Sequence, residues 1–190
     1  MFLTLITAAA TAVPVAAAPA PDLCHAMLPP ALVVQLTLAH GDYQLPRLAD
    51  LPIDVIRRNA ELGGWPCPLV AIADFDGDHR WDRALFLKHK SEPTVRLIAA
   101  LNTEKDGWQI GLQRDWPVPI DVVHIQPLEA GLYEQTQSES TKAAANTAAR
   151  LDELNSIQSD YSGFVAGQAQ GPRAAFFFQN ASWQFIWIAD

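Results

Sequence analysis

Four aspartates stand at alternate or near-alternate positions in one short segment of the chain. They occupy positions 1, 3, 5 and 9 of a loop that begins at Asp74. Carboxylates packed this closely repel one another unless a cation lies among them, and oxygen ligands at this spacing are selected by a hard cation such as calcium. In calcium loops the residue at position 7 contributes its main-chain carbonyl. The segment therefore predicts a calcium site formed by Asp74, Asp76, Asp78, Arg80 and Asp82.

The residues on either side of the aspartates predict strands rather than helices. Residues 69–73 form an apolar run, and residues 83–88 alternate in character. A helix-loop-helix calcium site would carry a bidentate Glu at position 12, where this chain has Leu85. We therefore expect a strand-loop-strand site, with Gly77 allowing the sharp turn.

The segment LVAIADFDGDHRWDRALFL resembles the calcium loops of integrin-like FG-GAP repeats and of the related VCBS repeats. The resemblance implies side-chain ligation by Asp74, Asp76, Asp78 and Asp82. It covers one loop and its two strands. The chain departs from the family at His79, where glycine is usual because the backbone there is often left-handed.

A metal-free alternative remains open for the same residues. The segment is then an acidic turn whose charges are met by His79, Arg80 and Arg83. If calcium binds, a structural role is expected rather than a catalytic one. An affinity of roughly 10⁻⁴–10⁻³ M, typical of extracellular modules, would be sufficient outside the cytoplasm.

The first twenty residues predict a secretory signal peptide. Residues 1–20 carry no charged side chain and end in small residues, and cleavage after Ala17 fits best. They lack the usual Lys or Arg after Met1, so an Ala- and Pro-rich leader is the alternative. Prolines interrupt a run already too short to cross a bilayer. We expect a single exported domain over residues 21–190, periplasmic or secreted, with no membrane association after cleavage.

Only two cysteines occur, Cys24 and Cys67, and both follow the predicted cleavage site. In an oxidising compartment two cysteines most simply form one disulfide bond. That bond would join the mature N-terminus to the segment before the aspartate loop. It would contribute on the order of 3–4 kcal/mol by restricting the unfolded chain.

The pattern along the chain predicts an α+β fold that is mostly β. A helix is expected at residues 30–40, where the valines leave a strand as the alternative, and a second helix at residues 50–64 with Asp50 as its N-cap. An antiparallel meander should follow, closed by a C-terminal hairpin across Asn180 and Ala181. A polar loop or helix is expected over residues 135–155. The predicted strands lie at residues 69–73, 83–88, 94–101, 108–113, 122–128, 163–167, 173–178 and 182–188.

Aromatic residues on the last strand, Trp183, Phe185 and Trp187, alternate with Ile186 and Ile188. An exposed aromatic stripe would be a binding platform, but apolar residues on both faces favour burial in the core.

Charge and motifs restrict the function. The net charge of -8 excludes a nucleic-acid partner, which requires a basic surface, and favours basic partners. The sequence shows no catalytic elbow, phosphate loop or histidine pair at metal spacing, so no catalytic residues are assigned and we expect a protein that is not an enzyme.

The overall layout resembles that of small exported bacterial proteins, some of which bind calcium. They include immunity proteins that neutralise cell-wall-degrading toxins of antibacterial type IV and type VI secretion systems. The resemblance implies a periplasmic binding or inhibitor protein whose partner is such a toxin or another protein. The alternative is an exported hydrolase with a structural calcium site.

Overall fold

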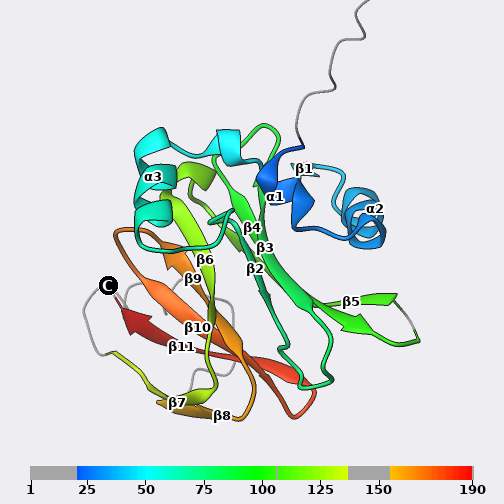
Figure 1. Ribbon diagram of the computed structural model, residues 1–190, viewed down its shortest axis with the longest axis vertical. Helices are drawn as coiled ribbons and strands as arrows, with labels where there is room; N and C mark the ends of the chain where they lie inside the picture. Colours follow the sequence, from blue (N-terminus) through cyan, green and yellow to red (C-terminus); the bar gives the residue numbers. More distant parts are fainter. Residues whose placement is uncertain (1–20, 106, 137–154, 190) are drawn as a thin grey trace, which may run out of the picture.

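Antiparallel strands form most of the protein, and a few short helices flank them (Figure 1). The computed structural model describes residues 21–105, 107–136 and 155–189. The signal peptide predicted at residues 1–20, and residues 137–154 of the predicted polar segment, lie outside these ranges. The mostly β, α+β class expected from the sequence is confirmed.

The first sheet has the strand order β1-β3-β4-β5, and β2 pairs with the N-terminal half of β3. From β2 to β5 successive strands are hydrogen-bonded neighbours, as in the predicted meander. The register pairs Ala73 with Asp82 across the aspartate loop. The strands are β1 (Tyr43–Gln44), β2 (Val70–Ala73), β3 (Asp82–His89), β4 (Val95–Thr103) and β5 (Gly107–Trp116).

The second sheet has the order β11-β10-β9-β6, so β6 pairs with β9 rather than with its predecessor β5. Its strands are β6 (Val123–Leu128), β9 (Gly163–Gln168), β10 (Arg173–Gln179) and β11 (Ser182–Ala189). The short strands β7 (Gly131–Glu134) and β8 (Ser156–Ser159) form a separate pair. The predicted hairpin is confirmed, and its turn residues Asn180 and Ala181 both have positive φ.

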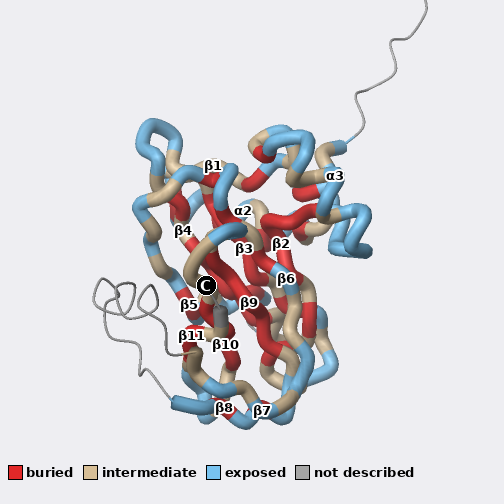
Figure 2. The backbone as a smooth tube through the Cα atoms, turned by 90° about the vertical axis from the view of Figure 1, so that its left-hand side faces the viewer, coloured by how far each residue is buried: buried red, intermediate tan, exposed pale blue. Residues whose placement is uncertain are grey.

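The core lies between the two sheets, and the first sheet is also covered on its outer face (Figure 2). In β3 the four consecutive residues 84–87 are all buried, which requires cover on both sides. Trp183, Phe185 and Trp187 of β11 are buried in this core, as predicted.

Helices α1 (Leu23–Ala26) and α2 (Pro30–Ala39) lie on the side of the first sheet away from the second sheet (Figure 1). Leu32 and Leu36 of α2 are almost fully buried. Helix α3 (Ile53–Glu61) confirms the second predicted helix, but its N-cap is Pro52. The cap predicted at Asp50 was wrong: this residue belongs to a 3-10 turn, Leu48–Asp50, and its carboxylate pairs with Arg47 and Lys88.

The predicted disulfide bond is present between Cys24 and Cys67, whose Cα atoms are 5.0 Å apart. Both cysteines are fully buried. The bond joins α1 to the segment that leads into β2, so it fixes the chain just before the aspartate loop.

Candidate metal centre

The aspartate loop connects β2 to β3, as the sequence predicted. Asp74 shapes this turn, because its Oδ1 accepts hydrogen bonds from the main-chain N–H groups of Gly77 (2.8 Å) and Asp78 (3.1 Å). Its Oδ2 accepts a third from the N–H of His79 (2.9 Å). Short polar side chains that bind nearby backbone N–H groups favour such turns over regular structure.

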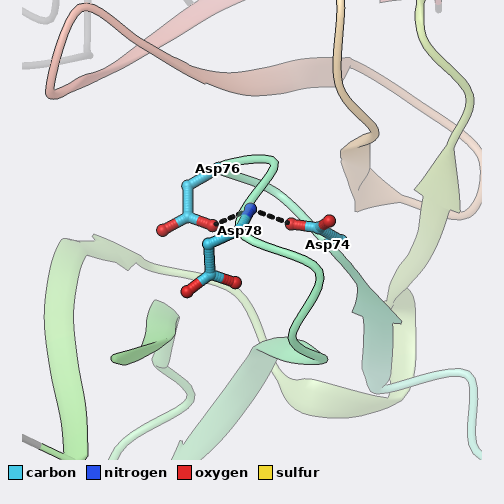
Figure 3. Close-up of side chains that lie close together, drawn as sticks. All are labelled: Asp74, Asp76 and Asp78. Atoms are coloured by element: carbon cyan, nitrogen blue, oxygen red, sulfur yellow. Dashed lines mark hydrogen bonds between the residues drawn. The ribbon is translucent and has the colours of Figure 1, made fainter. Parts of the chain in front are cut away.

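The loop brings three of the predicted ligands together (Figure 3). One carboxylate oxygen from each of Asp74, Asp76 and Asp78 lies within 4.8 Å of the others. Burial raises the pKa of Asp76, and the negative charges of Asp78 and Asp74 raise it further, against a hydrogen bond from the Asp78 N–H. A divalent cation among these oxygens would remove the repulsion. The arrangement thus supplies a concave set of hard oxygen donors.

Asp82 has a different environment from these three residues. Its side chain is completely buried. Its two carboxylate oxygens accept hydrogen bonds from the main-chain N–H groups of Phe75 and Asn102, with an N···O distance of 2.7 Å in each case. Burial raises the pKa of Asp82 to about 7, and the charges of Asp76 and Asp78 raise it as well, against the two backbone hydrogen bonds. Asp82 therefore joins the start of the loop to β4 from behind the cluster.

The basic residues near the loop neutralise only part of its charge. Arg80 was predicted to contribute its carbonyl, and its guanidinium lies beside Asp78 (3.6 Å) and Glu104 (3.4 Å). His79 is 97% exposed in its side chain, with Nδ1 3.8 Å from Asp74. Arg83 donates instead to the main-chain carbonyls of Met27, Trp81 and Asp82. The charge of Arg83 also interacts with that of Asp82, so Arg83 contributes to the metal-free alternative at Asp82.

Two backbone positions in the loop have a left-handed conformation. His79 has φ +66°, as expected at the position where the related loops carry glycine. Gly77 has φ +79°, and a Cβ atom at this position would overlap the ring of Tyr161 in the β8–β9 turn. Tyr161 was not predicted from the sequence, because the contact joins segments more than eighty residues apart.

Asp76 also borders an open pocket of about 400 Å³ between the loop, the β8–β9 turn and the β10–β11 turn. Asp160, Tyr161 and Asn180 line it as well, and none of its described lining residues is basic. Trp81, the last residue of the aspartate loop, is 64% exposed. The aspartate cluster therefore borders a hollow without a basic residue in its described lining, and the same loop carries an exposed indole.

Comparisons with protein-family models, with curated proteins and with solved structures found no match. The similarity to FG-GAP and VCBS loops thus rests on the residues of the loop itself. None of the helices in the described ranges is long and apolar enough to cross a membrane.

Proposed function

We propose that this is an exported calcium-binding protein that acts by binding another protein, as a periplasmic inhibitor of the immunity type. The convergence of Asp74, Asp76 and Asp78 on one turn carries the calcium assignment. Export is supported by the disulfide bond, because such bonds persist in oxidising compartments, and by the uncharged N-terminal segment.

The surface around the loop supports a protein partner with basic character. The net charge of the chain is -8, and the pocket beside Asp76 combines carboxylates and amides without a basic residue among its described lining. Exposed tryptophans are frequent anchors of protein interfaces, and Trp81 belongs to the same loop as Asp76. A basic cell-wall hydrolase, whose substrate cleft attracts anionic polymers, is the partner class with matching charge.

Calcium binding is tested by thermal unfolding of the protein in 10 mM calcium and in excess chelator. With a dissociation constant of roughly 10⁻⁴–10⁻³ M, calcium should stabilise the fold by about 1.5–3 kcal/mol. For a chain of this size that shift corresponds to about 3–10 °C in Tm. Asp76→Asn should abolish most of the shift, whereas the exposed Asp121→Asn should retain it. An unchanged midpoint in the wild type would refute the calcium assignment.

Partner binding is tested by co-purification with a cell-wall hydrolase encoded next to this gene, and by inhibition of that hydrolase. Trp81→Ala should weaken the complex by tenfold or more, in the range of about 1.5–3 kcal/mol found for interface anchors. Trp65→Ala is the matched control, because Trp65 is also partly exposed but precedes β2 at the end away from the loop. Absence of any complex with such a neighbour would count against the inhibitor function while leaving the calcium result intact.

A further inference from the structure

A second pocket, unrelated to the aspartate loop, lies where α1 and α2 meet the edge of the first sheet. Its volume is about 320 Å³, within the range of small-molecule sites. The apolar part of its wall is formed by Leu36 of α2, Leu87 of β3 and Leu45. Leu36 and Leu87 are each 1% exposed, so this wall is continuous with the core. The pocket can therefore accept an apolar chain.

The polar part of the wall is basic. His25, His40, Arg47 and Lys90 all line the pocket, and none of its described lining residues is Asp or Glu. This composition is unusual for a chain with a net charge of -8. A basic lining in an acidic protein concentrates positive potential at one place on the surface.

Asp50 pairs with one cation of the lining and with a lysine outside it. Asp50 is shared between Arg47 (3.2 Å) and Lys88 (2.9 Å), so one negative charge faces two cations. The ammonium group of Lys90 donates to the main-chain carbonyl of Gly41, which carries no formal charge. The described lining itself thus carries the cations Arg47 and Lys90 without a carboxylate, a composition that favours an anionic ligand.

His40 adds a buried donor at the same place. It is 7% exposed, and its Nδ1 lies 3.3 Å from Nη1 of Arg96. Because a guanidinium can only donate, Nδ1 must accept, and the imidazole proton is therefore on Nε2. That Nε2 has no hydrogen-bond partner in the described part of the chain. Nε2 has almost no accessible surface, so His40 forms a buried part of the wall and does not contact a ligand in this conformation.

Arg96 is already occupied and fixes the imidazole from the other side. Its Nε and Nη2 donate to the two carboxylate oxygens of Asp115 at 2.6 and 2.7 Å. Its guanidinium also stacks over Tyr43, which lines the pocket, with 4.2 Å between Cζ and the ring centroid. The carboxylate of Asp115 is therefore paired with Arg96, and this carboxylate does not neutralise Lys90 or Arg47.

We propose that this pocket binds a small monocarboxylate with an apolar chain. The carboxylate lies beside Lys90 and Arg47, and the chain lies against Leu36, Leu45 and Leu87. The site is separate from the aspartate loop and does not depend on calcium.

The proposal is tested with three six-carbon probes, hexanoate, hexylamine and hexanol, added to the full-length protein with its disulfide bond intact. Amide chemical shifts in ¹H–¹⁵N spectra report both the location and the saturation of binding. We expect hexanoate to shift α2, β1 and the end of β3 saturably, and the other two probes to bind at least tenfold more weakly. Lack of saturation by hexanoate would overturn the proposal, and so would equal binding of hexanol, since the pocket would then select only the apolar chain.

Lys90→Gln should weaken hexanoate binding about two- to fivefold, the range expected for a partly exposed charge pair. The matched control is Arg57→Gln, which removes the same charge from an exposed position of α3 outside the pocket. An equal loss in both variants would mean that net charge rather than this pocket governs binding, which would also overturn the proposal. The comparison of the three probes on the wild type is independent of how either variant folds.

Discussion

The four aspartates of the loop have different roles because they accept different numbers of hydrogen bonds from main-chain N–H groups and differ in burial. Asp74 accepts hydrogen bonds from three main-chain N–H groups of the turn, whereas Asp76 and Asp78 accept one each. Asp82 is buried and satisfied by two N–H groups from separate segments. A single aspartate spacing therefore determines both the shape of the loop and the cluster of carboxylate oxygens that we propose as calcium ligands.

His124 of β6 gives a prediction about pH. Burial lowers the pKa of His124, and the positive charge of Arg173 lowers it further, against a backbone hydrogen bond involving Gly167. The unfolded chain, with a histidine pKa of about 6.5, therefore takes up the proton first as the pH falls. The contribution of His124 to the free energy of unfolding should thus decrease as the pH is lowered below about 6.5, while the raised pKa of Asp82 acts in the opposite direction. His124→Gln should reduce this decrease.

The measurement is urea unfolding of the wild type and of His124→Gln at pH 7 and pH 5. His25→Gln serves as the control, because His25 is exposed, and it should show the same change in the free energy of unfolding between the two pH values as the wild type. The burial argument fails if His124→Gln loses as much stability between the two pH values as the wild type does.

At the scale of elements, patterns within one segment were predictable, and pairings between distant segments were not. Strands such as β3 and β11 could be predicted because each is a largely apolar run with turn residues close to it in the sequence. Helix α1 has only four residues and β1 only two, which is too short for a periodic signal. β6 and β9 are neighbours in the sheet, although the polar segment at residues 135–155 lies between them in the sequence. The division into two sheets therefore could not be derived from strands that follow one another in the sequence.

The same distinction applies to the candidate sites. The cluster of Asp74, Asp76 and Asp78 lies within five residues, so its spacing alone predicted it. The contact of Gly77 with Tyr161 depends on the fold, as does the pocket that combines His25 with Lys90. Asp50 looked like a helix cap because the sequence could not show that Lys88 would lie 2.9 Å away.

Gly77 tests how the loop depends on the neighbouring β8–β9 turn. Gly77→Ala places a Cβ atom in a left-handed position and against the ring of Tyr161. We expect a loss of about 1–3 kcal/mol in the free energy of unfolding, from strain and displacement of the ring. Calcium affinity should fall as well, because the N–H of Gly77 helps to orient Asp74.

Urea unfolding in chelator measures the stability part of this prediction. Gly41→Ala is the control, since Gly41 has no neighbouring atom within 4 Å of an added Cβ and no positive φ. Adding Tyr161→Ala to Gly77→Ala should restore part of the loss by removing the overlap with the ring. A Gly77→Ala variant as stable as Gly41→Ala would show that the loop adapts without strain.

At the scale of the whole molecule, two local constraints act on the opposite ends of one short strand. The disulfide bond fixes the segment just before β2 to α1, and the aspartate loop fixes the end of β2 to β3. β2 has only four residues, and three of them, Val70, Ala71 and Ala73, are buried in the core. An exported protein that meets calcium and an oxidising environment together would gain both constraints after export.

Removing the disulfide bond separates these two constraints. Replacing both Cys24 and Cys67 with serine should lower the free energy of unfolding by about 3–4 kcal/mol, because the bond closes a chain of 43 residues in the unfolded state. The affinity for calcium should change less than twofold, since the three ligand aspartates are held by hydrogen bonds within their own loop. Urea unfolding and calcium titration of the same variant measure the two quantities. Loss of calcium binding in a variant that still folds would show that the loop is shaped by the disulfide-bonded segment rather than by its own residues.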